Sequence, residues 1–187
     1  MIANYRFEDL VAGAQNGESW AITALYREFQ PRLLRYLRSQ EREVADDLAS
    51  EVWLAVARSV TRFEGDEAGF RAWIFTIARR QISDHRRRRA RRRTDPVGEA
   101  RFSTIASSSS PETEVVDELS AQVVVDLVGE LLSDEQAEVV LLRVLGGLDA
   151  KQVGEIMGHT ESWVRVNQHR ALARLADHLR PKLGVTP

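Results

Sequence analysis

The amino-acid sequence predicts an all-α protein made of two small helical domains joined by a flexible linker, the second a four-helix domain with a helix-turn-helix. Apolar residues recur at helical spacing through most of the 187 residues, and no stretch alternates apolar and polar residues as a half-buried strand would. A serine-rich segment that ends in proline interrupts this pattern in mid-chain. We therefore expect domains at residues 1–93 and 113–187, with a linker at 94–112.

The first domain is predicted to contain four helices. A short helix begins near Phe7 and stops at the Asn16-Gly17 pair, and a second covers about residues 18–37, with Trp20 and Leu34 among its expected core positions. Pro31 favours a kink or a break in that helix. A third helix is expected at residues 44–60, and the glycine-punctuated segment 61–69 is expected to form a loop.

The fourth helix, which begins near Phe70, continues without a break into a block of arginines that ends at Arg93. At about 100° per residue, its apolar side chains gather on one arc and its arginines on the opposite arc. A solvated basic face is the plainer interpretation, but Asp84 is the only acid that interrupts the arginines. We expect this helix to pack one side into a core and to offer guanidinium groups to phosphates. The arginines concerned are Arg79, Arg80, Arg86 and Arg87.

Charge is distributed unevenly along the chain although its net value is only −2. Residues 71–101 carry 11 basic and 3 acidic side chains, whereas residues 1–70 carry 8 and 12 and residues 102–187 carry 7 and 13. One basic island between acidic regions suggests a protein that needs a partner to bind DNA well. There is no cysteine, which excludes disulfides and thiolate zinc sites. No signal peptide or membrane-spanning run is recognisable, so we expect a cytoplasmic protein without membrane insertion.

The second domain carries three helix-start signals. Ser133 with Gln136 and Asp149 with Gln152 have capping-box spacing, and Thr160 can cap a long helix that reaches about residue 180. Between the last two helices lies a tight turn at residues 158–160. A short helix, a turn with glycine and a longer helix are the parts of a helix-turn-helix, although ordinary helical hairpins share this spacing.

The long helix divides into two sides. Val164, Ala171 and Leu172 lie toward one side with other apolar residues, and Leu179 is expected there as well. The opposite side has the chemistry of a major-groove reader, because arginine can bind a guanine edge in bidentate fashion and an exposed valine can contact a thymine methyl group. The candidate DNA-binding residues on that side are Ser162, Arg165, Val166, His169 and Arg170.

Taken together, these segments resemble the extracytoplasmic-function group of bacterial sigma factors of the sigma-70 family. DDLASEVWLAVARSVTRFEG (46–65) resembles the region that docks on the clamp helices of the largest RNA polymerase subunit. FRAWIFTIARRQISDHRRRRAR (70–91) resembles the region that melts the promoter and recognises its minus-ten element. LLSDEQAEVVLLRVLGGLDAKQVGEIMGHTESWVRVNQHRALARL (131–175) resembles the domain that reads the minus-thirty-five element.

The resemblance implies a function and a set of site residues. The protein would bind core RNA polymerase, on the clamp helices and on the flap of the second-largest subunit, and direct promoter-specific initiation on promoter DNA. The loop of Phe63, Glu64, Gly65 and Asp66 would capture a base extruded from the non-template strand. Asp47, Glu51 and Trp53 would face the polymerase, and an anti-sigma factor is a candidate partner for the same surface. For Trp53, plain core packing is an equally good interpretation.

Two departures from the family pattern affect the promoter sequence that the second domain would read. Trp163 stands where the family often has threonine or serine, and Val166 and Asn167 stand where it often has serine and arginine. These differences leave the DNA-binding role intact but leave the preferred promoter sequence open.

The same residues also suggest two other classes of function. An enzyme or metal site would need His85 or His169 with nearby carboxylates, but His85 lies in an arginine run that opposes cation binding, so we expect no catalytic activity, metal or cofactor. A one-component helix-turn-helix regulator would use the same reader without polymerase. Such a regulator usually dimerises and carries a sensory domain, and the sequence indicates neither a zipper-like seam nor such a domain.

Overall fold

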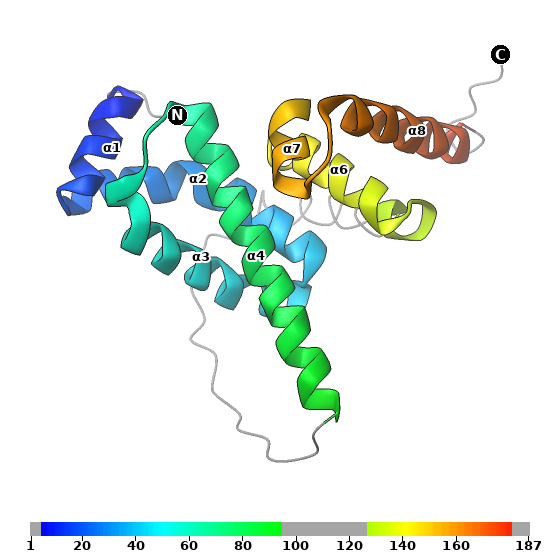
Figure 1. Cartoon of the computed structure of the whole chain (residues 1–187), viewed down its shortest axis with the longest axis horizontal. Coiled ribbons are helices and arrows are strands. Elements are labelled where there is room, and N and C mark those ends of the chain that lie inside the picture. The colour runs from blue at the N-terminus through cyan, green and yellow to red at the C-terminus, as the bar shows by residue number, and fades with distance from the viewer. Residues whose placement is uncertain (1–4, 95–126, 181–187) are drawn as a thin grey trace, which may run out of the picture.

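The computed structural model describes residues 5–94 and 127–180, and all regular secondary structure in these two ranges is helical, which confirms the all-α prediction (Figure 1). The expected linker at 94–112 lies outside the described residues, apart from Thr94 at the end of a helix. Apolar residues at helical spacing from about Glu114 to Leu132 also predict a first helix of the second domain, and the expected start of this helix lies outside the described residues as well.

The first two helices are α1 (Phe7–Gln15) and α2 (Ser19–Gln40), joined at the predicted Asn16-Gly17 stop. α2 runs through Pro31 without ending, because buried side chains on both sides of the proline, such as Leu25 and Leu37, hold it in the core. The expected burial of Trp20 is wrong, since this side chain is 43% exposed, with its indole N–H bonded to the Glu18 carboxylate.

α3 (Ala45–Ser59) lies between two short 3₁₀ turns, η1 (Arg42–Val44) and η2 (Val60–Arg62). The loop predicted at 61–69 is shorter in the structure, because α4 already begins at Glu67. The cause is local: the Asp66 carboxylate accepts a hydrogen bond from the backbone N–H of Gly69 at 2.8 Å, which satisfies a donor of the first turn.

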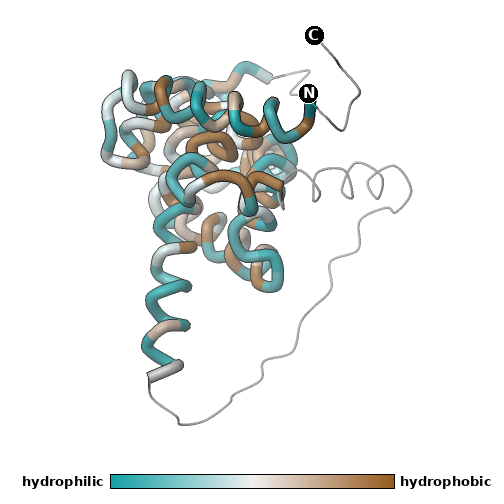
Figure 2. Tube along the Cα trace, turned by 90° about the vertical axis from the view of Figure 1, so that its right-hand side faces the viewer, coloured by the Kyte–Doolittle hydropathy of each residue, from teal (hydrophilic) through white to brown (hydrophobic). Residues whose placement is uncertain are grey.

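α4 (Glu67–Thr94) is a single helix of 28 residues that joins the apolar segment to the arginine run, as predicted. Its N-terminal half contacts α2, α3 and a helix of the C-terminal part. Its core side chains are almost completely shielded from solvent. They are Phe70, Ile74, Phe75, Ala78 and Ile82. The C-terminal half projects away from the rest of the described chain and is mainly hydrophilic (Figure 2).

The C-terminal part contains helical residues 127–131, α6 (Asp134–Val144), α7 (Ala150–Met157) and α8 (Glu161–Leu179). All three predicted caps are confirmed. The backbone N–H of Gln136 donates to Ser133 Oγ at 3.4 Å, that of Gln152 to Asp149 Oδ1 at 2.8 Å, and that of Trp163 to Thr160 Oγ1 at 3.2 Å.

The buried side of α8 is narrower than the sequence predicts. Val164 and Ala171 are completely buried, whereas Leu172 is 47% exposed and Leu179 is 36% exposed. Val164 and Ala171 are seven residues apart, so they fall on nearly the same line along the helix, and Leu172 is turned about 100° away from it. Leu172 and Leu179, which the sequence places on the same side of the helix as Val164, are therefore not part of its buried strip.

The two helical parts pack directly against each other along α4. Their buried apolar residues form one continuous cluster, and polar contacts surround it. Gln152 Nε2 donates to the carbonyl of Ala68 at 2.9 Å, and Arg71 Nη1 to that of Gly147 at 3.3 Å. The pair of Arg79 and Glu138 completes this set, which we call the interdomain contact.

We predict that Gly154→Ala destabilises the protein by about 1–3 kcal/mol, because an added Cβ would lie 2.6 Å from the carbonyl oxygen of His159 in the turn before α8. Gly129→Ala is the control: its Cβ would meet nothing within 4 Å. The measurement is the free energy of unfolding in urea for both variants. Equal stabilities of the two variants would contradict the prediction.

Candidate nucleic-acid and polymerase interfaces

The five candidate DNA-binding residues of α8 form one exposed face. Thr160 is the N-cap residue of α8, just before this face begins. Val166 on this face is apolar and yet 47% exposed. An exposed valine flanked by arginines provides an apolar contact beside hydrogen-bond donors. The structure thus brings together all five residues that were singled out, which are Ser162, Arg165, Val166, His169 and Arg170.

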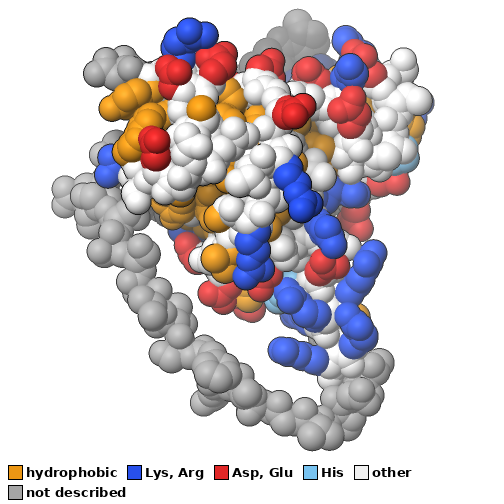
Figure 3. All heavy atoms as spheres, turned by 60° about the vertical axis from the view of Figure 1, so that its left-hand side comes forward, with side chains coloured by type: hydrophobic (Ala, Val, Ile, Leu, Met, Phe, Trp, Pro, Cys, Tyr) orange, Lys and Arg blue, Asp and Glu red, His pale blue; other side chains and the backbone are white. Residues whose placement is uncertain are grey.

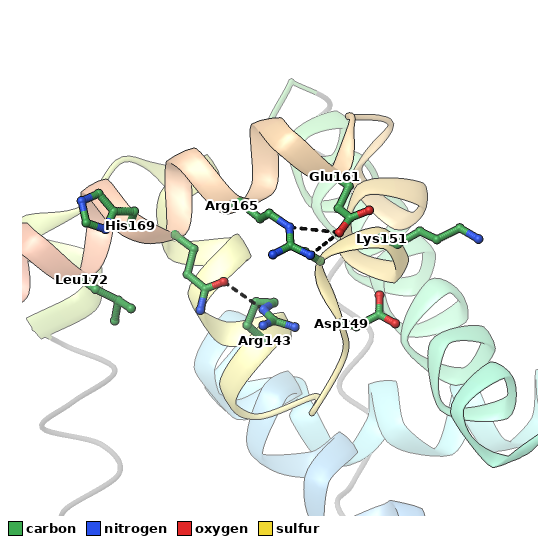
Figure 4. A pocket seen from close by; sticks show the side chains of 9 residues that line it. Arg143, Asp149, Lys151, Glu161, Arg165, His169 and Leu172 are labelled. Carbon is green, nitrogen blue, oxygen red and sulfur yellow. Dashed lines mark hydrogen bonds and ion pairs between the residues drawn. The ribbon is translucent and has the colours of Figure 1, made fainter.

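A surface hollow of about 590 Å³ lies beside this face (Figure 4). Arg165 and His169 of α8 line it together with Lys151 of α7 and Arg143 of α6. Glu161 accepts a hydrogen bond from Arg165 Nε at 3.0 Å, one turn along the helix. The hollow therefore gathers cations from three helices, one of them held by a carboxylate.

Sequence reasoning missed two cations of this hollow. Lys151 is the second residue of α7 and is exposed, and the signal for it was its place in the capping box. Arg143 is half-buried, and its guanidinium bonds Gln168 Oε1 at 2.9 Å and the carbonyl of Leu148. Arg143 thereby ties α6 to α8, a role that gives no local sequence signal.

The turn between α7 and α8 is closed by an aromatic pair. The rings of His159 and Trp163 stack with centroids 3.7 Å apart and planes 11° apart. Trp163 is half-buried, so the residue that departs from the family pattern covers the turn rather than standing free in solvent.

The loop of Phe63, Glu64, Gly65 and Asp66 is fixed at both ends. Phe63 is half-buried and packs against Trp73 and Phe70, with ring centroids 5.2 and 5.0 Å away. Gln15 Nε2 donates to the carbonyls of Val60 at 3.2 Å and Phe63 at 2.9 Å. Sequence reasoning missed Gln15, because its partners lie 45 and 48 residues away.

The four candidate arginines of α4 differ in their surroundings. Arg80 is 84% and Arg87 73% exposed, each within 3.9 Å of Asp84, whereas Arg86 lies 2.6 Å from Glu41. Lys and Arg side chains gather along the projecting part of α4, with Asp and Glu side chains beside them (Figure 3).

The fourth candidate, Arg79, is paired across the interdomain contact. Its Nε lies 2.8 Å from Glu138 Oε1, and its Nη1 donates to the carbonyl of Ile156 at 3.2 Å. The hydrogen bond to Glu138 raises the pKa of Arg79, although burial opposes the rise. Burial raises the pKa of the neighbouring Tyr36 and Glu138 adds to it, yet the Tyr36 hydroxyl has no direct hydrogen-bond partner among the described residues.

The candidate polymerase-facing residues lie on α3. Asp47 is exposed, and Glu51 is half-buried and lies 3.3 Å from Arg88. Trp53 is half-buried, with its indole N–H bonded to Gln30 at 2.7 Å and its ring 5.1 Å from that of Tyr26. Trp53 is thus partly a packing residue and partly a surface residue.

Exposed apolar side chains extend this face. Leu54 is 55% exposed and shares a helix face with Asp47 and Glu51, at spacings of seven and three residues. On α2, Tyr26 is 44% exposed and Ile22 is 41% exposed. Sequence reasoning missed all three, although a leucine in register with two acids was the available signal.

The described residues contain no group of three or more His, Cys, Asp or Glu side chains that could hold a metal ion. Among the same residues, none of the helices combines the length and the apolarity that a bilayer span requires.

Comparison with known proteins agrees with this geometry. The family model for Sigma-70 region 2 matches residues 25–92, and that for Sigma-70, region 4 matches residues 130–177. The ECF RNA polymerase sigma factor SigD of Mycobacterium tuberculosis (strain ATCC 25618 / H37Rv) is 32% identical over 180 residues, which cover 93% of this chain and 84% of SigD. The chain belongs to the ECF sigma factors.

A second relative of this sigma factor is longer. The ECF RNA polymerase sigma factor BldN of Streptomyces coelicolor is 34% identical over 173 residues, which cover 91% of this chain but 65% of BldN. The chain thus spans about two thirds of that relative.

The fold of this sigma factor also resembles a solved structure. CnrH, determined in complex with the cytosolic domain of CnrY, superposes with a TM-score of 0.65 over 94% of this chain and 97% of CnrH. At 20% sequence identity, this likeness concerns the fold alone.

We predict that Gln15→Ala loosens the loop at residues 63–66, because two backbone carbonyls lose their side-chain donor. The expected cost is about 1–3 kcal/mol of stability, with faster amide hydrogen exchange at residues 60–66. Gln30→Ala is the matched control, since Gln30 bonds Trp53 instead. Equal exchange in this segment for both variants would show that Gln15 does not hold the loop.

Proposed function

We propose that this sigma factor binds core RNA polymerase through the exposed face of α2 and α3 and reads promoter DNA through two further surfaces. The observation that carries the proposal is the combination, in one chain, of an exposed helix-turn-helix face, a projecting arginine helix and a separate acidic and apolar face. Binding to DNA alone does not account for the acidic and apolar face of α2 and α3, whereas binding to polymerase does.

The minus-thirty-five element is assigned to α8. Ser162, Arg165, Val166, His169 and Arg170 would face the major groove, and Lys151 of α7 would contact a phosphate at the edge of the same site. Exposure of all six side chains supports this assignment. Phosphate contacts fix the register of a protein on DNA, and base contacts supply the sequence preference.

The minus-ten element is assigned to the loop at 63–66 and to α4. A loop fixed by Gln15 and by the packing of Phe63 supplies a rigid rim, and Glu64, Gly65 and Asp66 form the part that would meet an extruded base. Arg79, Arg80, Arg86 and Arg87 would hold the phosphates nearby. For Arg79 and Arg86, that contact requires exchange of a carboxylate for a phosphate.

On the polymerase side, Asp47, Glu51 and Trp53 are assigned to the clamp helices of the largest subunit, and the C-terminal domain to the flap of the second-largest. An anti-sigma factor that covered the α3 face would exclude polymerase by direct competition. In these roles the protein would act in the cytoplasm, as an initiation factor and not as an enzyme.

The deciding experiment mixes the purified protein with bacterial core polymerase, looks for co-elution, and tests the complex for start-site-specific transcription from genomic fragments. Co-elution with specific initiation is the expected result. Failure of the folded, inhibitor-free protein to bind core would overturn the proposal, and a tight dimer on palindromic DNA would favour a one-component regulator.

We predict that Leu54→Ala weakens binding to core polymerase about fivefold or more, because an exposed apolar anchor is lost. Its free energy of unfolding should change by less than about 0.5 kcal/mol, since the side chain is 55% exposed. Tyr5→Ala, which truncates a side chain that is also 55% exposed but lies outside the proposed interfaces, is the control in a fluorescence binding titration. Unchanged core affinity for Leu54→Ala would remove this residue from the interface.

We predict that Arg165→Ala reduces discrimination at one base pair of the minus-thirty-five element by about 1–3 kcal/mol, the usual value of a bidentate arginine contact. The measurement compares transcription from the preferred promoter and its single-base variants. Arg6→Ala, which removes an arginine that is 79% exposed on the first domain, is the control. A uniform loss on all promoters would indicate a phosphate contact instead of base reading.

A further inference from the structure

Arg79 of α4 binds the C-terminal part of the chain through all three nitrogens of its guanidinium, although 40% of its side chain is exposed. Its Nε and Nη2 lie 2.8 and 3.5 Å from the two carboxylate oxygens of Glu138, and its Nη1 donates to the carbonyl of Ile156 at 3.2 Å. All three guanidinium nitrogens therefore have partners. Three of its five N–H donors are used in this way, and the edge formed by Nε and Nη2, which could bind a phosphate in bidentate fashion, is held by the carboxylate.

Three other arginines of α4 form ion pairs with carboxylates of their own domain. Arg86 and Arg89 lie near Glu41, and Arg88 near Glu51. These pairs can open without moving one domain away from the other. Arg79 is different, because its carboxylate belongs to α6.

We propose that Arg79 alternates between Glu138 and promoter DNA, so that the interdomain contact and minus-ten DNA binding exclude each other. In the closed arrangement, the Glu138 carboxylate occupies the place of a DNA phosphate. This inference rests on the proposed role of α4 in DNA binding. It adds an autoinhibitory contact within the chain, which operates without any inhibitor protein.

Burial of Glu138 couples the release of Arg79 to separation of the two domains. The Glu138 side chain is only 20% exposed and lies near the buried Tyr36. If Arg79 moved to DNA while the domains stayed closed, this carboxylate would remain partly desolvated without its partner. That state is unfavourable, so transfer of Arg79 to DNA separates α6 from α4.

Separation also breaks the neighbouring contacts. Arg71 leaves the carbonyl of Gly147, Gln152 leaves that of Ala68, and the buried apolar cluster that the two parts share is divided. DNA alone must therefore overcome several interactions, whereas polymerase, by binding both domains apart, removes them in advance. The apparent affinity for DNA equals the affinity of the open form multiplied by the fraction of molecules that are open.

The test uses two cysteines introduced into a chain that has none. Ala12→Cys on α1 and Ala176→Cys on α8 are both exposed, and the two helices lie at opposite ends of the described chain (Figure 1). Donor and acceptor dyes at these positions report domain separation in the free full-length protein. The DNA probe is a mixed-sequence single-stranded oligonucleotide of about 16 nucleotides.

Glu138→Gln removes the charge and keeps the shape. We expect lower energy transfer than in the unsubstituted protein, and about fivefold or more tighter binding of the probe. Glu135→Gln removes the same charge from an exposed position of the same helix, so it controls for long-range electrostatics and should give a smaller change in both measurements.

The charge swap Arg79→Glu with Glu138→Arg is the second variant. It should restore the energy transfer of the closed arrangement but not the gain in DNA binding. Energy transfer in Glu138→Gln equal to that of the unsubstituted protein, or a gain in affinity equal to that of Glu135→Gln, would overturn the proposal. Core polymerase binding is measured separately, so failure of the proposed function would be recognised by loss of that binding alone.

Discussion

The arrangement of the whole described chain depends on the burial of one side of α4. Phe70 and Ile74 are completely shielded and Phe75 nearly so, and each contributes about 1.5–3 kcal/mol relative to an exposed side chain. The same helix packs on α2 and α3 and then contacts α7 of the C-terminal part. Because its apolar side is fixed in this way, its arginines lie on the outside, near carboxylates of α3, of α6 and of Glu41 at the end of α2.

The local structure was predictable because it is encoded locally. The spacing of apolar residues predicted the helices. The pairs Ser133 with Gln136 and Asp149 with Gln152 predicted where α6 and α7 begin, because a helix cap involves residues only three positions apart. The errors have physical causes. Pro31 does not end α2 because packing on both sides of it outweighs the lost hydrogen bond, and Trp20 lies at the surface because its indole finds the Glu18 carboxylate there.

The candidate site was predictable only in part. The exposed side of α8 followed from helical geometry, and Lys151 could have been found from the capping box. Contacts between residues far apart along the chain could not, because nothing near Arg79 in the sequence indicates Glu138, which lies 59 residues away. For the same reason the role of Gln15 in holding the loop at 63–66 was missed. The resemblance to ECF sigma factors supplied the roles that composition and spacing alone left open.

Under the proposed role of α4 in DNA binding, the carboxylates beside this helix also affect how the protein searches a chromosome. A cell contains vastly more random DNA than promoters, and an arginine run with no partners would keep a protein on whichever phosphates it met first. Here Arg86 and Arg88 must each give up a carboxylate before they bind a phosphate. Random DNA therefore retains the protein less strongly than the number of its arginines suggests, and a larger share of the molecules stays in free diffusion.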